Sequence, residues 1–196
     1  MDEKHPLNPR SPYAATKAGA DRLAYAYAVT YDLPIVILRP FNNYGPRQHP
    51  EKLIPQFVTS ALDDEPLTVH GDGSASRDWL YVDDDAGAIE AAIDADLDVV
   101  SGEVINVATG VDLSVTEIAD LVLDALGKPA SLKVHIDERP GQVQRHIGST
   151  EKAARLLGWT ARTRFETGLE RTVAWYRDNE AWWRGVRARS VGVYSS

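Results

Sequence analysis

The pattern of hydrophobic and polar positions predicts helices and strands that alternate along the chain. Residues 13–31 form an Ala-rich stretch in which Leu23, Tyr27 and Ala28 lie on one apolar stripe, as expected for a helix. The continuous apolar run at 35–38 is typical of a strand that is buried on both faces. A long helix that leads into such a strand is half of an α/β unit, so the pattern predicts an α/β protein.

The remainder of the chain continues this pattern. Strands are predicted at 67–70, 79–82, 104–107 and 132–136. Helices are predicted at 52–63, with a break near Pro55, and at about 166–183. Three more helices are predicted: one that starts at Asp83, Asp84 and Asp85 and runs to about 95, one that follows Ser114, and a short one that ends at Gly158. Ser114 and Glu117 form a capping box, and Gly127 supplies the C-terminal stop of the same helix. The Arg- and Ser-rich tail after residue 184 is expected to be loosely held.

The composition is that of an ordinary globular chain, and it excludes several kinds of site. The 196 residues, 43% hydrophobic and 26% charged, suffice for one sizeable domain or one and a half small ones. The absence of cysteine excludes disulfides, thiolate zinc sites and thiol nucleophiles, and the five histidines have no metal-ligand spacing, so no metal is expected. The net charge of −8 argues against nucleic acid as a partner. With no apolar run near the roughly 20 residues of a membrane span and no signal sequence, no membrane partner and a cytoplasmic location are expected.

The start of the first predicted helix holds the strongest candidate for chemistry. Ser11 can cap this helix, and Pro12 suits its first turn. Tyr13 and Lys17 are four residues apart and share one helix face. A phenol at the positive end of the helix dipole and beside an ammonium group should have a lowered pKa, so Tyr13 is a candidate general acid/base for a sugar or alcohol hydroxyl. The spacing alone equally fits an ordinary helix start with an exposed lysine.

A second candidate is the loop 39–46, because ligands of open α/β sheets bind just beyond the carboxyl ends of strands. This loop and further motifs in the same order resemble the C-terminal part of an extended short-chain dehydrogenase/reductase. Within that group, the chain resembles the NAD-dependent epimerase/dehydratase family and most closely the nucleotide-sugar 4,6-dehydratases of the dTDP-glucose type. The matching stretches are 11–17, 39–46, 50–55, 71–84, 139–141, 157–159 and 165–176.

The resemblance implies a fold and a division of the chain. It implies the C-terminal part of a Rossmann-type fold together with a smaller α/β substrate-binding subdomain. Residues 1–48 would be the remnant of the NAD-binding Rossmann domain, with the catalytic helix and the strand and loop that follow it. Residues 49–196 would be mainly the substrate-binding subdomain, with segments near 76–108 returning to the Rossmann sheet.

The resemblance also implies roles for residues around the cofactor, NAD. Tyr13 would take the proton from the 4-hydroxyl of the sugar while hydride leaves C4 for the nicotinamide. Lys17 would hydrogen-bond the nicotinamide ribose and lower the pKa of Tyr13. Pro40 would border the nicotinamide.

Further positions would bind the second ligand, a nucleotide sugar. Asn42 matches a family position that contacts the sugar nucleotide, although a turn-forming role after the strand is the alternative from the residues alone. Glu51, Lys52 and Leu53 match a segment that lines the substrate pocket in dehydratases, and otherwise fit a surface helix start.

Three more positions, Arg77, Asn106 and Arg139, match those that hold the diphosphate in the family. The arginine fork suits this task because it matches phosphate oxygens and is always charged. An isolated arginine in an acidic protein is more often solvated or salt-bridged, and only the family order favours the ligand-binding interpretation of Arg77 and Arg139.

The chain contains no Gly-x-x-Gly-x-x-Gly motif after a strand, the loop that cradles the NAD pyrophosphate in this family. The sequence therefore suggests a fragment with little activity of its own, which either forms a homo-oligomer or pairs with a separate N-terminal half. Two alternatives to a dehydratase remain: a nucleotide-sugar 4-epimerase of the UDP-glucose type, and a non-catalytic module that binds nucleotide sugars or is purely structural.

Overall fold

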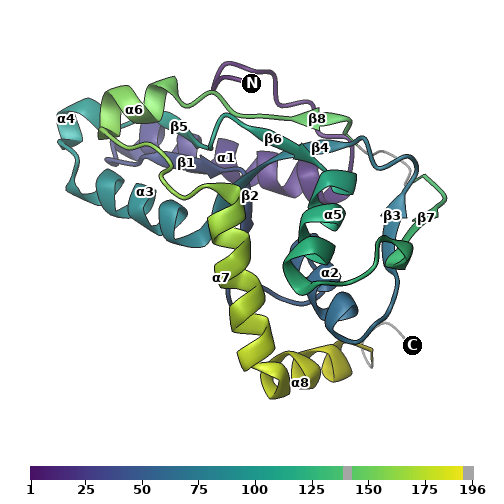
Figure 1. Cartoon of the computed structure of the whole chain (residues 1–196). Coiled ribbons are helices and arrows are strands. Elements are labelled where there is room, and N and C mark those ends of the chain that lie inside the picture. The colour runs from purple at the N-terminus through teal and green to yellow at the C-terminus, as the bar shows by residue number, and fades with distance from the viewer. Residues whose placement is uncertain (139–142, 192–196) are drawn as a thin grey trace. The chain divides into compact units, whose positions relative to one another are not determined.

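The computed structural model describes residues 1–138 and 143–191 and is an α/β structure (Figure 1). In chain order its elements are α1 (Pro12–Tyr31), β1 (Ile37–Pro40), β2 (Asn42–Tyr44), α2 (Leu53–Leu62), β3 (Leu67–His70), β4 (Ser76–Tyr81), α3 (Val82–Asp94), α4 (Leu97–Val100), β5 (Val104–Val107), β6 (Asp112–Ser114), α5 (Val115–Leu126), a 3-10 turn η1 (Ala130–Leu132), β7 (Lys133–Ile136), β8 (Arg145–His146), α6 (Glu151–Leu157), α7 (Phe165–Asp178) and α8 (Glu180–Val191). The chain divides into two compact units. Unit 1 comprises 1–43, 77–112 and 141–162, and unit 2 comprises 44–76, 113–140 and 163–196.

Unit 1 is built around the parallel pair of strands β1 and β5, in which Ile37 lies opposite Val104 and Pro40 opposite Val107. Its core is formed by side chains from β4, α3, β5 and α6 and from the loop after α6: Leu80, Ala88, Ile105, Val107, Ala153 and Trp159. Because parallel strands end at the same edge of a sheet, the residues that follow β1 and β5 lie close together. A further sheet has the order β2-β4-β6, and β8 also pairs with β4.

Unit 2 is built around the second parallel pair, β3 and β7, in which Leu67 lies opposite Lys133 and His70 opposite Ile136. Helices α2 and α5 pack on β3 and on each other, and α7 packs on both helices. These elements, together with α8 and Tyr44 of β2, supply its largest buried side chains: Tyr44, Ile54, Phe57, Val58, Leu67, Val69, Ile118, Leu123, Tyr176 and Trp183.

Local signals in the sequence predicted several helix ends correctly. Helix α5 has the complete capping box of Ser114 and Glu117, and Gly127 ends it in the left-handed conformation at φ 64°. Gly158 ends α6 in the same conformation at φ 60°. These ends are confirmed because each depends on a cap that is encoded within a few residues.

Other expectations were wrong. Helix α2 is not broken at Pro55, because this proline lies in the first turn, where a helix needs no backbone N–H donor from it. The helix expected at 166–183 is two helices that meet at Asn179. The tail after residue 184, expected to be loosely held, continues the second helix, α8, up to Val191, and its last residues, 192–196, lie outside the described residues. The strand expected at 35–38 begins two residues later and is only partly buried.

The apolar residues of α1 do not form the single covered stripe that was expected: Leu23 and Tyr27 are exposed, and Ala28 is partly buried. No residue of α1 is buried, and Leu23, Tyr27, Val29 and Tyr31 are between 50% and 66% exposed. A helix of 20 residues normally buries an apolar stripe against a partner element. The exposed face of α1 is therefore a surface to which a partner could bind.

Candidate active site

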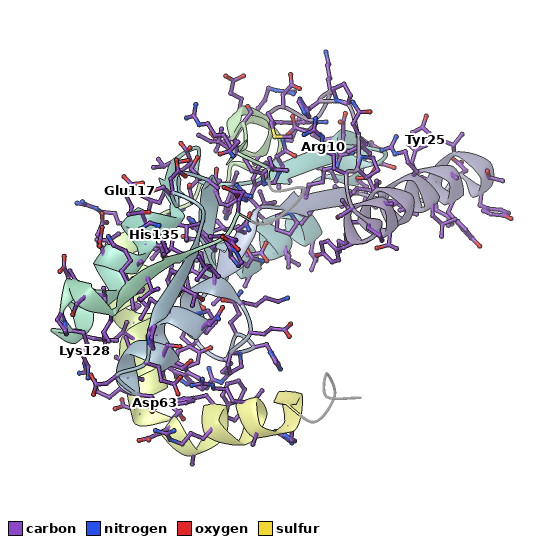
Figure 2. The ribbon with its side chains drawn as sticks, turned by 90° about the vertical axis from the view of Figure 1, so that its right-hand side faces the viewer. Arg10, Tyr25, Asp63, Glu117, Lys128 and His135 are labelled. Atoms are coloured by element: carbon purple, nitrogen blue, oxygen red, sulfur yellow. The ribbon has the colours of Figure 1, made fainter. Side chains whose placement is uncertain are left out.

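The start of α1 has the geometry that its sequence predicts. Ser11 adopts an extended conformation, and its Oγ accepts a hydrogen bond from the backbone N–H of Ala14 at 3.1 Å, with Pro12 as the first helical residue. Tyr13 is 73% exposed and Lys17 is also exposed, so both side chains are accessible to a ligand. The stick view likewise shows the side chains of α1, Tyr25 among them, pointing outward from the helix (Figure 2).

An ion pair between Asp21 and Arg39 ties α1 to β1, and Arg22, also on α1, pairs with the same carboxylate. Arg39 Nε donates to Asp21 Oδ2 at 2.7 Å, and Arg22 Nε donates to Asp21 Oδ1 at 2.9 Å. Burial raises the pKa of Asp21, but hydrogen bonds from Arg39 and Arg22 outweigh it and leave this pKa below its usual value. Since α1 has no buried residue, this cluster is a main contact that fixes the helix carrying Tyr13 and Lys17 against the strand.

The ion pair therefore predicts a pH-dependent contribution to stability. Asp21→Asn is expected to lower the free energy of unfolding by about 1–2 kcal/mol at pH 7, between the values typical of exposed and buried pairs. Because the pKa of Asp21 is lower in the folded chain than its usual value of 3.8, the ionised carboxylate stabilises the folded chain at pH values above 3.8. This stabilisation is lost as the pH falls through the lowered pKa of the folded chain. Urea unfolding at several pH values between about 7 and 2 should show the difference from the parent chain shrinking in acid.

A matched charge change on an exposed residue, Glu170→Gln on α7, should alter the free energy of unfolding by less than about 0.5 kcal/mol. An Asp21→Asn difference that stays constant down to the lowest pH would show that the charge of Asp21 is not the cause.

The carboxyl ends of β1 and β5 bring two of the predicted site residues together. Pro40 ends β1, and Asn106 lies opposite Arg39 in the register of the two strands. Asn106 is 3% exposed; its backbone N–H donates to Glu3 Oε1 at 2.9 Å and its Nδ2 donates to Met1 O at 3.2 Å. The amide of Asn106 is thus already engaged by the residues that precede α1.

Asn42 begins β2, and its neighbour Asn43 has a partner that the sequence did not indicate. Asn43 Nδ2 donates to Asp85 Oδ2 at 2.6 Å. Burial raises the pKa of Asp85, while this hydrogen bond partly opposes the shift. The run Asp83–Asp85 does begin helix α3, but its last member also fixes the Asn42–Asn43 segment.

Arg77 is partly buried on β4, and burial lowers its pKa because the guanidinium is partly removed from water. The imidazole of His146 stacks on Phe41, with ring centroids 4.5 Å apart and an angle of 24° between the ring planes. Burial and then the positive charge of Arg77 lower the pKa of His146, so this imidazole adds little positive charge at neutral pH. Arg77 is therefore a partly buried cationic group in this part of unit 1.

Asp78, the residue after Arg77, is completely buried and accepts four hydrogen bonds. They come from Thr109 N at 2.9 Å, Thr109 Oγ1 at 2.7 Å, Gly110 N at 2.9 Å and Gly148 N at 3.3 Å. The donors are far from Asp78 in the sequence. Only its position beside Arg77 could have drawn attention to it.

In unit 2, the predicted segment at 51–53 forms the start of α2. Lys52 is the N-cap residue and Leu53 the first helical residue. Glu51 and Lys52 are exposed, with Glu51 Oε1 and Lys52 Nζ 3.1 Å apart, and this contact lowers the pKa of Glu51. Both charged side chains are accessible to a ligand, but they also form an ion pair with each other, as neighbouring charged residues on a protein surface commonly do.

Two tyrosine hydroxyls make hydrogen bonds that attach residues 44–48, which precede this segment, to α7. Tyr44 Oη donates to Phe165 O at 3.1 Å, and Tyr176 Oη donates to Gln48 O. Burial strongly raises the pKa of Tyr176, so its phenol remains a hydrogen-bond donor at all ordinary pH values. The sequence match at 165–176 gave no indication that α7 anchors residues 44–48.

Six predicted site residues lie in unit 1, namely Tyr13, Lys17, Pro40, Asn42, Arg77 and Asn106, and three in unit 2, namely Glu51, Lys52 and Leu53. Arg139 lies outside the described residues. Within the described ranges, no group of three or more His, Cys, Asp or Glu side chains could hold a metal ion. No helix in those ranges has both the length and the apolar character needed to cross a membrane.

The sequence model of a family described as GDP-mannose 4,6 dehydratase matches residues 1–172, which is most of the chain. The chain belongs to this family. This assignment and the α/β structure confirm the resemblance and the fold class that the motifs predicted.

Individual relatives agree with this assignment. The chain is 44% identical over 181 residues to a dTDP-glucose 4,6-dehydratase of Actinoplanes sp., in an alignment that covers 92% of this chain and 56% of the relative. Its structure is similar to that of DesIV, a dTDP-glucose 4,6-dehydratase from Streptomyces venezuelae with NAD and TYD bound, with a TM-score of 0.90, 41% identity and coverage of 95% of this chain and 57% of DesIV.

An epimerase of the same fold is a more distant match. UDP-glucuronic acid 4-epimerase from Bacillus cereus, in complex with UDP-glucuronic acid and NAD, gives a TM-score of 0.86 at 32% identity, with coverage of 91% of this chain and 56% of the epimerase. The chain thus spans little more than half the length of the relatives that it matches.

Proposed function

We propose that this chain is the part of an NAD-dependent nucleotide-sugar 4,6-dehydratase that binds the nucleotide sugar and carries the Tyr-Lys pair. The observation that carries this proposal is the 41% identity to DesIV, a dehydratase whose structure holds NAD and TYD. The start of α1 supports it, because accessible Tyr13 and Lys17 side chains stand at the positive end of a capped helix. The substrate class proposed is a hexose linked to a nucleoside diphosphate, of the dTDP-glucose type.

In the proposed reaction, a bound NAD would supply the hydride acceptor for C4 of the sugar and the hydride donor for C6. The phenolate of Tyr13 accepts the proton of the 4-hydroxyl, so that loss of proton and hydride together leaves a ketone at C4. Lys17, one turn further along α1 on the same helix face, would hydrogen-bond the nicotinamide ribose. The exposure of both side chains and the position of Pro40 at the end of β1 fit a nicotinamide there. No residue of this chain is assigned to the loss of water from C5 and C6.

Binding of the nucleotide sugar is assigned to further residues that the resemblance predicts. The guanidinium of Arg77, with Arg139, would bind the diphosphate, since arginine matches phosphate oxygens in charge and geometry. Asn106 is proposed for the same ligand, and its Nδ2 would have to exchange its hydrogen bond to Met1 O for one to a phosphate oxygen. Asn42 and the segment Glu51, Lys52 and Leu53 would contact the sugar. The second candidate function is a nucleotide-sugar 4-epimerase, favoured by the similarity to the Bacillus cereus epimerase but at a lower identity of 32%.

The chain is also proposed to need a partner, either a second copy or a separate polypeptide that completes the cofactor site. The exposed face of α1 and the two-stranded parallel sheet β1–β5 support this, since parallel sheets normally have more strands and both faces covered. This proposal would be contradicted if the chain is a monodisperse monomer in light scattering and stays a monomer when a separate N-terminal half is added.

The proposed binding function can be tested on the chain itself by calorimetry. We expect dTDP-glucose to bind, and Arg77→Ala to weaken binding by about 10- to 100-fold, because a hydrogen bond to a charged group contributes about 1.5–3 kcal/mol. Arg162→Ala, which removes an exposed arginine of the same unit, should leave the affinity unchanged. A folded chain that binds neither dTDP-glucose nor UDP-glucose would overturn the proposed function.

A further inference from the structure

We propose that Asp78 is a positioning residue for diphosphate recognition: its buried carboxylate fixes β4 so that the neighbouring Arg77 side chain meets the diphosphate of the nucleotide sugar. This inference rests on the proposed function, because it assumes that Arg77 binds a diphosphate. It adds a residue that contacts no substrate and acts through another side chain.

The four hydrogen bonds to Asp78 use both of its oxygens. Oδ1 accepts from the backbone and hydroxyl of Thr109, and Oδ2 accepts from the backbone N–H groups of Gly110 and Gly148. Because the side chain is 0% exposed, water cannot replace any of these donors. A buried carboxylate with several charge-assisted hydrogen bonds has one favoured orientation, so Asp78 is held firmly in place.

These donors come from two segments that the sequence places far from β4. Thr109 and Gly110 form the turn just after β5, the strand that carries Asn106. Gly148 follows β8, which pairs with β4. A Cβ at Gly148 would lie only 2.4 Å from Ala108 Cβ and 2.8 Å from Phe41 Cε2. The backbone at Gly148 therefore packs against Ala108 and Phe41 too closely to leave room for a side chain. Asp78 therefore joins the strand of Arg77 to the end of the strand of Asn106.

The alternation of side chains along a strand connects this buried cluster to the ligand. Arg77 and Asp78 are consecutive in β4, so their side chains point to opposite faces of the strand. Fixing Asp78 on one face thus fixes the rotation of the strand and the direction of Arg77 on the other. Arg77 itself is only partly accessible, so a small change in its direction would move its fork away from phosphate oxygens. Positioning errors of about 1 Å are enough to weaken such contacts strongly.

The test compares binding of dTDP and dTMP, which share the nucleoside and differ by one phosphate. Asp78→Asn keeps the size of the side chain but puts an NH₂ group against at least one backbone N–H, so the fixed orientation is lost. We expect Asp78→Asn to weaken dTDP binding by about 10-fold and dTMP binding by less than about 3-fold, so that the preference for dTDP falls. Thr109→Val removes only one of the four hydrogen bonds and should give a smaller loss in the same direction. Asp94→Asn makes the same charge change at an exposed position on α3 and should change neither affinity.

The outcomes separate the two proposals. If the parent chain binds none of dTDP, dTDP-glucose and UDP-glucose, the proposed function is wrong and this inference falls with it. If Arg77→Ala weakens dTDP binding but Asp78→Asn does not, or if Asp78→Asn weakens dTDP and dTMP equally, Asp78 is structural only and this inference alone is wrong. If Asp78→Asn does not fold, Thr109→Val decides by the same dTDP-to-dTMP comparison.

Discussion

Replacement of Tyr13 by phenylalanine is expected to lower turnover of dTDP-glucose by about 10²- to 10⁴-fold, the usual contribution of a general acid/base. Phenylalanine keeps the ring but removes the oxygen that would accept the proton of the 4-hydroxyl. The side chain is 73% exposed at the start of α1, and the Ser11 cap does not involve it. The free energy of unfolding and the affinity for dTDP-glucose should therefore stay close to those of the parent.

Turnover can be measured with this chain joined to the remaining part of a dTDP-glucose 4,6-dehydratase relative. The product, a 4-keto-6-deoxy sugar, absorbs in alkali and is easily followed. Tyr25→Phe is the matched control, since it removes the same oxygen from an exposed position on the same helix. Near-normal turnover of the Tyr13→Phe enzyme would remove Tyr13 from the mechanism, whereas equal losses in both variants would indicate damage to α1.

Sequence reasoning succeeded where the determinant is local. The caps of α1, α5 and α6 each lie within a few residues, so Ser11, Ser114 and Gly158 could be assigned without knowledge of the fold. The family order of motifs supplied Tyr13, Lys17 and Arg77 as candidates. The structure places these three in unit 1, and their roles stay predictions.

Sequence reasoning failed where the determinant is a contact between distant segments. Asp78 receives hydrogen bonds from residues 31 to 70 positions away, and Asp85 from Asn43, 42 positions away. No local pattern distinguishes these aspartates from the many others in an acidic chain. Likewise, the apolar pattern at 166–183 is consistent with one helix, and the break at Asn179 depends on what α8 packs against.

Helix α8, which follows this break, is held in unit 2 by a buried tryptophan whose loss should strongly lower stability. Trp183 of α8 is 0% exposed, and its Nε1 donates to Tyr176 O at 2.9 Å. The guanidinium of Arg184 lies over the Trp183 ring at 4.5 Å and also pairs with Asp63, which ends α2. Trp183 thus joins α8 to both α7 and, through Arg184, α2.

Trp183→Ala is expected to lower the free energy of unfolding of unit 2 by about 3–5 kcal/mol, since it removes a large buried ring and leaves a cavity. Trp182→Ala is the matched control: the neighbouring ring is 40% exposed and should cost less than about 1.5 kcal/mol. Urea unfolding followed by circular dichroism measures both variants. Tyr176 of α7, which contacts Trp183, also donates a hydrogen bond to Gln48 O in the segment before α2. Trp183→Ala should therefore also make this segment more mobile, and faster hydrogen exchange at residues 44–53 would detect the change. Equal destabilisation by the two substitutions would mean that α8 contributes only general surface cover, and that the buried Trp183 ring is not what holds it in place.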